Sequence, residues 1–378
     1  MELYVHIPFC ARKCRYCDFL SFPAGEELKE RYIDALCSEL NSLYGLHDVS
    51  TCFIGGGTPS IVPARLMEKL LHTISRIGVK GEYTVECNPG TVDAEKLKLY
   101  REYGINRISF GLESADDEEL EKLGRIHVFD DFLRSYELAG KCGFDNINID
   151  LMSGLPGQTL KSLEKTLKTA AGLGPKHISV YSLIIEEGTP FYDLYGKNDE
   201  LLPDEDTERE MYHMTGELFS EYGFRRYEIS NYALKGYECV HNLGYWTGEE
   251  YTGTGIGAAS YLKNGENGFA RYKNPDDISR YISICADKKE HAAEELRTQV
   301  ETLAEKDLVS EYIILHLRLT EGFDRREFRT AFGFDIYERF GKILDKYLNM
   351  GLLETDGTRI RLSLKGLDVA NTVMADFL

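Results

Sequence analysis

Three cysteines near the N-terminus are the residues whose type and spacing most directly suggest chemistry. Cys10, Cys14 and Cys17 are spaced i, i+4 and i+7 after a short apolar segment. Thiolates are soft ligands that select iron–sulfur clusters, zinc or copper(I) over hard cations. A structural zinc site needs a fourth ligand, and no cysteine or histidine follows nearby, since position 19 is phenylalanine. A [4Fe–4S] cluster held by three thiolates leaves one iron open to a small molecule, and the spacing favours that arrangement.

Six strand-like segments alternate with helical segments and must position these cysteines. The strands are predicted at residues 3–8, 50–55, 82–88, 107–113, 146–152 and 177–183. The helices between them are predicted at 26–44, 61–77, 93–103, 116–122, 129–142 and 159–172, from the helical spacing of apolar residues. Repeated strand–helix units imply parallel strands. Six units are too few for an eight-stranded barrel, so an open, partial barrel is expected.

The predicted strands carry polar residues on one face, and this face must line the barrel interior because the apolar face packs on the helices. The polar residues on strands three to five are Thr84, Glu86, Asn88, Arg107, Ser109, Glu113, Asn146, Asn148 and Asp150. An ordinary barrel of this kind fills its interior with branched apolar side chains. The sequence therefore predicts a cavity for a charged ligand, with a buried hydrogen-bond network as the alternative.

A glycine-rich segment, Gly55-Gly56-Gly57-Thr58-Pro59, follows the second predicted strand. Glycines permit close backbone approach and positive φ. At the carboxyl end of a barrel strand, where the site of such folds is built, the segment indicates a ligand-binding loop.

The composition describes a globular chain and limits its partners. The chain has 378 residues, 43% of them apolar and 28% charged, with a formal charge of −19. That charge disfavours nucleic acid and anionic membranes. No apolar run reaches the ~20 residues that span a bilayer, and no signal peptide is indicated. The cysteine usage suggests a reducing, cytoplasmic compartment. The six other cysteines are expected to be small buried side chains, and they are Cys37, Cys52, Cys87, Cys142, Cys239 and Cys285.

The cysteine motif, with Tyr16 just before its third cysteine, resembles that of the radical S-adenosylmethionine (SAM) enzymes. The resemblance implies a (β/α)6 partial TIM barrel over residues 1–200. It implies that SAM chelates the open iron of a [4Fe–4S] cluster. It also implies that an electron from the cluster cleaves SAM to methionine and a 5′-deoxyadenosyl radical.

The same resemblance, carried over position by position, implies a set of SAM-contacting residues. They are Tyr4, Tyr16, Gly56, Gly57, Thr58, Glu86, Glu113, Arg125, Asp150 and Ile184. Glu113 stands where relatives usually carry glutamine, which exchanges an amide for a carboxylate. For the acidic residues the alternative role is a cap or an ion pair, and for Arg125 it is a solvated surface position.

Residues 201–299 form a predicted connecting region with a helix at 203–222 and an extended segment at 227–233. It contains His241-Asn242-Leu243-Gly244-Tyr245-Trp246. The His-Asn-x-x-Tyr-Trp pattern resembles the motif of the heme chaperone branch of the radical-SAM coproporphyrinogen III oxidase family. A neutral imidazole is a good axial ligand of heme iron, and aromatic rings offer flat faces to a porphyrin. The alternative for His241 is a satisfied core histidine. The glycines at 253–260 are taken as a tight loop at the barrel edge, because no strand–helix–strand unit surrounds them as a dinucleotide loop would require.

Residues 300–378 are predicted to form a winged-helix-like α+β module. Helices are expected at 301–319 and 335–350, and a hairpin with an Asp356-Gly357 turn at 352–362, followed by a helical pattern. DNA binding is the alternative for such a module. The helix at 335–350 balances acidic and basic residues and has no basic face, so a packing or substrate-covering role is expected.

Two branches of the resembled family differ at the cysteine motif. The oxygen-independent coproporphyrinogen III oxidases usually carry a fourth cysteine where Phe19 stands, and a longer segment before the cluster than the nine residues that precede Cys10. Together with the motif at 241–246, these differences favour a heme chaperone. The oxidase is the first alternative, and a nucleic-acid-binding regulator is the second. No residue is assigned as a catalyst, although SAM cleavage is implied.

The implied cofactors are the [4Fe–4S] cluster, SAM and heme. The implied partners are heme-acceptor proteins, membrane-bound respiratory enzymes among them, and an electron donor such as flavodoxin or ferredoxin. A peripheral membrane contact of a cytoplasmic protein is compatible with such acceptors.

Overall fold

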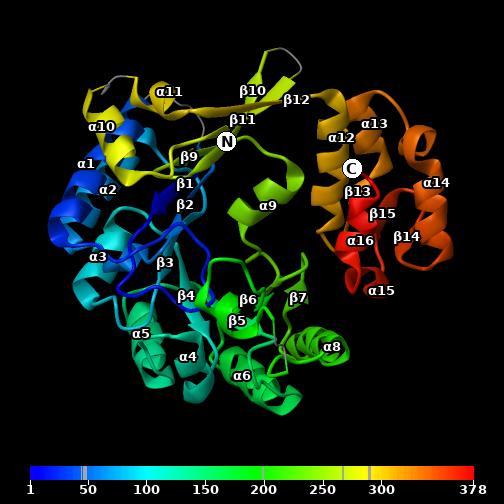
Figure 1. Cartoon of the computed structure of the whole chain (residues 1–378), viewed down its shortest axis with the longest axis horizontal. Coiled ribbons are helices and arrows are strands. Elements are labelled where there is room, and N and C mark those ends of the chain that lie inside the picture. The colour runs from blue at the N-terminus through cyan, green and yellow to red at the C-terminus, as the bar shows by residue number, and fades with distance from the viewer. Residues whose placement is uncertain (44, 46–48, 198–199, 266–267, 288–290) are drawn as a thin grey trace.

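Six parallel strands in chain order form the centre of the fold (Figure 1). The computed structural model describes residues 1–43, 45, 49–197, 200–265, 268–287 and 291–378. The central strands are β1 (Glu2–Ile7), β2 (Thr51–Gly56), β3 (Tyr83–Cys87), β4 (Arg107–Glu113), β5 (Asn146–Ser153) and β6 (His177–Ser182). Each pairs in parallel with the next. The predicted partial barrel is therefore confirmed.

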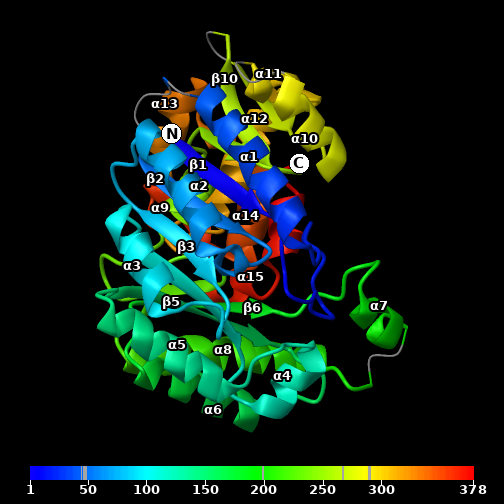
Figure 2. The ribbon, with the colours of Figure 1, turned by 90° about the vertical axis from the view of Figure 1, so that its left-hand side faces the viewer.

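The connecting helices cover the outer face of this sheet (Figure 2). They are α1 (Glu26–Ser42), the 3-10 turn η1 (Pro59–Ile61), α2 (Ala64–Ile77), α3 (Ala94–Glu102), α4 (Asp117–Leu123), α5 (Phe129–Lys141) and α6 (Leu160–Gly172). Side-chain caps begin several of them: Asp93, Asp116 and Thr159 accept hydrogen bonds from the first-turn backbone. Position 44, the predicted end of the first helix, lies outside the described residues.

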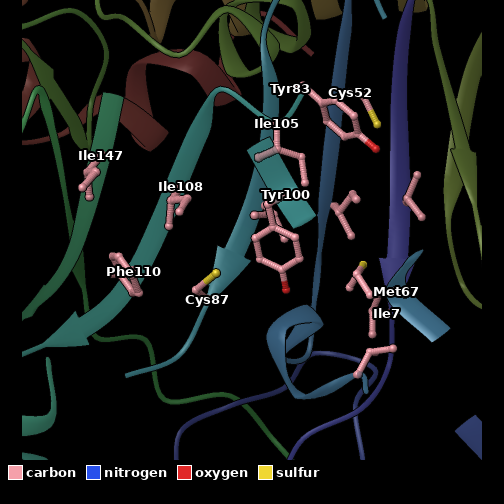
Figure 3. Close-up of a cluster of buried hydrophobic side chains, with 14 of the residues drawn as sticks. Ile7, Cys52, Met67, Tyr83, Cys87, Tyr100, Ile105, Ile108, Phe110 and Ile147 are labelled. Atoms are coloured by element: carbon pink, nitrogen blue, oxygen red, sulfur yellow. The ribbon is translucent and has the colours of Figure 1, made fainter. Parts of the chain in front are cut away.

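The apolar core lies between the strands and these helices, as the alternation along the strands predicts (Figure 3). Ile108 and Phe110 of β4 are completely buried, and Figure 3 shows them in the same cluster of buried side chains as Tyr100 of α3. The alternate β4 residues, Arg107 among them, must consequently point to the opposite, interior side of the barrel.

Further strands extend the central sheet at both edges. They are β7 (Arg225–Arg226), β8 (Asn231–Ala233), β9 (Tyr251–Thr254), β10 (Ala259–Asn264), β11 (Gly268–Lys273) and β12 (Gln299–Leu303). Among the described residues the sheet runs β12-β11-β10-β9-β1-β2-β3-β4-β5-β6-β8-β7. Strand β9 joins β1 in parallel, and β10 to β12 continue as an antiparallel meander.

Two predictions made from the sequence are wrong in part at this edge. The tight loop predicted over 253–260 is limited to residues 255–258, since β9 and β10 occupy its flanks. The helix predicted from residue 301 begins at Glu305, after β12. Glycines at 253, 255 and 257 hide the alternation of apolar and polar residues by which short strands are recognised.

Among the described residues, five helices lie between β6 and the last part of the chain: α7 (Pro190–Tyr195), α8 (Glu205–Glu221), α9 (Val240–Thr247), α10 (Ile278–Asp287) and α11 (Ala292–Leu296). Helix α9 lies across the amino ends of the central strands. Its backbone NH groups at Val240 and His241 donate to the carboxylate of Glu82, just before β3, at 3.1 and 3.2 Å. His241 also contacts Thr51, the first residue of β2. This helix therefore closes the barrel at the end opposite to the carboxyl ends of the strands.

The C-terminal module packs around its own apolar core and stands beside α9 (Figure 1). Its elements are α12 (Glu305–Leu317), β13 (Phe323–Asp324), α13 (Arg325–Phe332), α14 (Ile336–Asn349), β14 (Leu353–Thr355), β15 (Arg359–Leu362), α15 (Leu364–Leu367) and α16 (Ala370–Ala375). Its antiparallel sheet has the order β13-β15-β14, as a winged-helix-like module requires. The predicted boundaries after residues 200 and 299 stay predictions.

Candidate functional site

One loop presents the three cysteines at the carboxyl ends of the strands. It follows β1, and its backbone is fixed at both flanks: the Cys10 NH donates to Phe22 O at 3.1 Å, and the Arg15 NH donates to Leu123 O at 3.0 Å. All three thiols are partly exposed. Among the described residues, no three His, Cys, Asp or Glu side chains converge as they would around a single metal ion.

The glycine-rich segment after β2 supports this loop by close backbone approach. The Gly57 NH donates to Ile7 O at 2.8 Å, and the Thr58 NH donates to Phe9 O at 2.7 Å. A Cβ at Gly57 would lie 2.7 Å from Phe9 O and 3.0 Å from Cys10 Sγ. The contact is therefore possible only for glycine, and it places Thr58 Oγ1 3.7 Å from Cys10 Sγ.

Gly57→Ala is expected to displace the cysteine loop, because backbone oxygen cannot move aside as a flexible side chain can. We expect a loss of about 1–3 kcal/mol in unfolding free energy and a cysteine loop that no longer assembles a cluster. Gly25→Ala is the matched control, since Gly25 has a φ of −75° and nothing within 4 Å of its would-be Cβ. Thermal unfolding measures the stability of the two variants, and iron content after reconstitution measures cluster assembly. Equal stability and equal iron content of Gly57→Ala and Gly25→Ala would contradict the prediction.

Arg125 lies beside the second cysteine and is buried. Its Nη1 is 3.5 Å from Cys14 Sγ, and its Nη2 donates to Asn88 Oδ1 at 2.9 Å and to Gly111 O at 2.6 Å. The side chain is 7% exposed, so it is not a solvated surface arginine. A buried guanidinium at this position would compensate part of the negative charge of a thiolate-bound cluster.

A β-bulge at the end of β4 directs Glu113 toward this arginine. The register shifts between Gly111 and Glu113, and Glu113 has a φ of 69°, a left-handed conformation that costs about 1–2 kcal/mol for a residue with a Cβ. Its Oε1 lies 3.5 Å from Arg125 Nη1. Burial raises the pKa of Glu113 to about 7, against the opposing effect of Arg125. A strained residue that holds a carboxylate in an ion pair is typical of a functional site.

Two further carboxylates face the barrel interior. Glu86 Oε2 accepts a hydrogen bond from the Gly56 NH at 3.0 Å. Asp150 accepts from Ser109 Oγ at 2.7 Å and from Asn148 Nδ2 at 2.8 Å. Burial, and then the charge of Asp150, raise the pKa of Glu86 to about 8. The interior at this level therefore suits a cationic group, such as the amino group of an amino-acid ligand.

SAM binding to the cluster-free protein is expected to release protons near pH 7, because a free ammonium group beside Glu86 favours the carboxylate form of that residue. Calorimetry in buffers of different ionisation enthalpy would show up to about one proton released per SAM. Glu86→Gln should remove this release. A buffer-independent binding enthalpy of the wild type would contradict the prediction.

The raised pKa of Glu86 also fixes the sign of a stability effect in the ligand-free protein. Between pH 4.5 and about 8, folded Glu86 holds a proton that the unfolded chain has lost. The contribution of this residue to the unfolding free energy therefore falls as the pH rises through that window. Glu86→Gln should flatten the decrease.

A cavity of about 210 Å³ connects the acidic residues to helix α9. Its lining residues are Tyr4, Phe53, Glu86, Arg107, Ser109, Asn148, Asp150, Ser179, Tyr181, His241, Asn242 and Tyr245. The structure thus brings residues predicted for SAM and residues predicted for heme to one interior space. The predicted polar interior is a cavity with a hydrogen-bond network in its wall.

His241 is 1% exposed, and both of its ring nitrogens have partners. Nδ1 lies 2.7 Å from Thr51 Oγ1, and Nε2 lies 3.0 Å from the Tyr245 hydroxyl. Burial, and then the charge of Arg107, lower the pKa of His241 to about 3, so the imidazole is neutral. This arrangement is that of a satisfied core histidine. Iron ligation through Nε2 would require the Tyr245 hydroxyl to leave.

Trp246 and Ile184 are among the predicted residues that do not line the cavity. Trp246 faces the C-terminal module, where the Arg318 guanidinium is 4.4 Å from its ring centroid. Ile184 follows β6 and is 66% exposed. Sequence reasoning omitted Asn88 and Gly111 from the site, although Asn88 bridges Arg125 and Thr58. Strand alternation had already placed Asn88 on the interior face, and that signal could have identified it.

Comparison with known proteins first defines the class. The sequence model of the Radical SAM superfamily matches residues 4–170, and that of the HemN C-terminal domain matches residues 303–369. The fold is similar to the solved structure of coproporphyrinogen III oxidase (HemN) from Escherichia coli, with a TM-score of 0.85 at 22% identity, covering 100% of this chain and 89% of the other. The protein has the radical SAM fold, and this class implies a [4Fe–4S] cluster and SAM.

Relatives along the whole chain define the family. The heme chaperone HemW of Bacillus subtilis is 38% identical, with 99% of this chain and 98% of that protein covered. The heme chaperone HemW of Lactococcus lactis is 35% identical, with 99% and 96% covered. The chain belongs to the HemW family. None of its described helices is both long and apolar enough to cross a membrane.

Proposed function

We propose that this protein is a heme chaperone, which binds heme and delivers it to acceptor proteins. The observation that carries the proposal is the similarity to proteins named heme chaperone HemW along nearly the full length of both chains. The phenylalanine at position 19, where a fourth cysteine would stand in the oxidase branch, supports the same assignment.

The proposed cluster ligands are Cys10, Cys14 and Cys17. Three thiols on one fixed loop, the close approach of Gly57 and the guanidinium of Arg125 fit a thiolate-bound cluster better than a closed zinc site. When bound, the cluster supplies an open iron for SAM and an electron for its cleavage. Arg125 would compensate charge, and Asn88 would hold Arg125 in place.

The proposed SAM site lies between this loop and the interior cavity. Glu86, whose carboxylate is held by a hydrogen bond from the Gly56 NH, would accept a hydrogen bond from the amino group of SAM. Tyr4 and Asp150 line the same cavity, while Tyr16 contributes to lowering the pKa of Glu113 from the cluster side. Ile184 would line this site through its backbone, because its side chain faces solvent.

The proposed heme residues lie on α9. His241 would ligate the iron as a neutral imidazole, and Asn242 and Tyr245 line the cavity beside it. Trp246 points to the C-terminal module, so it would contact heme only from that side of the helix.

Heme titration after anaerobic reconstitution with iron and sulfide tests the function. The wild type is expected to bind heme stoichiometrically, with a Soret band, and to transfer it to apomyoglobin as a probe acceptor. The same preparation is then supplied with coproporphyrinogen III, SAM and a reductant. Decarboxylation of that substrate without heme binding would overturn the proposal in favour of the oxidase.

The proposal includes the partners and location that a heme chaperone implies. The protein would act in the cytoplasm, with a peripheral membrane contact where an acceptor is a membrane-bound respiratory enzyme. An electron donor such as flavodoxin or ferredoxin would reduce the cluster from the exposed side of the cysteine loop.

A further inference from the structure

The barrel interior contains a buried arginine whose guanidinium makes no hydrogen bond or ion pair with any described residue. Arg107 is 2% exposed and begins β4. Among the described residues, none accepts a hydrogen bond from its guanidinium, and its Nε is buried without any partner. No carboxylate of the described chain lies within ion-pairing distance. A buried charge is costly unless it is paired, so this position implies a counter-ion from outside the chain.

The nearest acidic groups are already engaged elsewhere. Asp150 accepts hydrogen bonds from Ser109 and Asn148. Glu82 accepts from the amino end of α9. The positive charge of Arg107 acts on neighbouring side chains: after burial, it is the second cause that lowers the pKa of both His177 and His241. These residues leave the guanidinium, which lines the cavity, without a hydrogen-bonded counter-ion.

A second unpaired polar group faces the same cavity from helix α9. Asn242 lines the cavity with Arg107, and its side chain makes no hydrogen bond with any described residue. Guanidinium donors match the two oxygens of a carboxylate, and an amide NH₂ supplies a further donor. Arg107 and Asn242 together therefore have the donor set of a carboxylate subsite.

The dimensions of the cavity limit the ligand. Its volume of about 210 Å³ is below the ~300–1,000 Å³ of pockets that enclose a drug-sized molecule. It has room for a carboxylate-bearing side arm. Tyr181 lines the cavity and is 42% exposed, so the cavity reaches the surface beside β6, where such an arm could enter.

The position of Arg107 separates this subsite from the SAM carboxylate. Arg107 and Glu113 are the two ends of β4, about 20 Å apart at ~3.3 Å per residue. Glu113, Arg125 and the cysteine loop lie at the carboxyl end, where an amino acid on the cluster iron would be held. Arg107 lies at the α9 end, among the residues proposed for heme.

We propose that Arg107 and Asn242 bind a propionate carboxylate of heme inside the barrel. This assignment rests on the proposed heme function and names which part of the ligand enters the cavity. Tyr4, Phe53 and Tyr245 line the same space and offer apolar ring faces to the arm and to the edge of the macrocycle.

Binding of hemin and of hemin dimethyl ester to the reconstituted protein tests the proposal. The wild type is expected to bind hemin at least tenfold more tightly than the diester, because the ester has no charge for Arg107. Arg107→Gln should bind both equally, and Arg107→Lys should keep part of the difference. Arg31→Gln, at an exposed arginine, is the control. SAM affinity and thermal unfolding of each variant show that the site and fold are otherwise intact.

Each other outcome is decisive. If the wild type binds hemin and its diester equally, or Arg107→Gln binds hemin as the wild type does, the subsite is refuted while the heme function stands. If Arg107→Gln loses SAM affinity but not hemin affinity, the arginine serves SAM and the proposal fails. If the wild type binds neither tetrapyrrole, the heme function and this subsite fail together.

Discussion

Replacing any one of Cys10, Cys14 and Cys17 by alanine is expected to leave the protein without a [4Fe–4S] cluster. Each thiolate would bind a different iron, and the chain offers no fourth cysteine in this loop to substitute for a lost one. Wild-type protein reconstituted under anaerobic conditions should contain about four irons and four sulfides per chain. The variants should contain almost none and lack the visible charge-transfer absorption.

Cys142→Ala is the matched control for these variants. Cys142 is partly exposed, as the three loop cysteines are, but it follows helix α5 on the outer side of the barrel. It should reconstitute as the wild type does. Full cluster content in any of the three loop variants, or its loss in the control, would show that the ligands have been assigned wrongly.

The sequence predicted the barrel because its signal is local and repeated. Ile108 and Phe110 alternate with Arg107 and Ser109 along one strand, and this alternation alone fixes which face meets the helices. The same period indicated a polar interior. The prediction therefore extended from the order of strands to the side on which Glu86 would lie.

The position of α9 could not be predicted in this way. The hydrogen bond between Thr51 and His241 joins residues 190 positions apart, and no local pattern encodes a contact at that separation. The motif at 241–246 indicated chemistry, but the helix could have covered either end of the barrel. Only the folded structure places it at the amino ends of the strands, opposite to the cysteine loop.

Whether Arg107 has an ion-pair partner is a second feature that only the folded structure shows. An arginine at the start of an interior strand is normally expected to find a carboxylate, and Asp150 is a plausible candidate from alternation alone. In the structure, Ser109 and Asn148 donate hydrogen bonds to the Asp150 carboxylate instead. Whether a buried charge has a partner depends on side-chain geometry across three strands, which sequence periodicity does not contain.

These features give the two ends of the barrel different sets of side chains. Thiols, Arg125 and strained Glu113 gather at the carboxyl ends of the strands, and His241, Asn242 and Arg107 gather at the amino ends. The cavity between them contains Glu86 and Asp150. Residues predicted for SAM and residues predicted for heme therefore line the wall of one cavity.

Tyr245→Phe is expected to strengthen heme binding about fivefold if His241 ligates the iron. The Tyr245 hydroxyl is hydrogen-bonded to His241 Nε2 at 3.0 Å. This hydrogen bond, which contributes about 1 kcal/mol net, must break before His241 can bind the iron. Removing the hydroxyl frees the nitrogen in advance. His241→Ala should weaken binding by at least tenfold, because the axial ligand is lost. Heme titration with Soret detection measures both effects.

The opposite signs of the two variants distinguish ligation from a structural role. Tyr251→Phe serves as the control, since the Tyr251 ring packs on Tyr245 at 4.7 Å without contacting His241; it should bind heme as the wild type does. A core histidine would give a different pattern. His241→Ala would then lower the melting temperature, because Thr51 Oγ1 loses its buried partner, while Tyr245→Phe would leave heme affinity unchanged. That pattern would remove His241 from the heme site and leave Asn242 and Arg107 as the residues to test there.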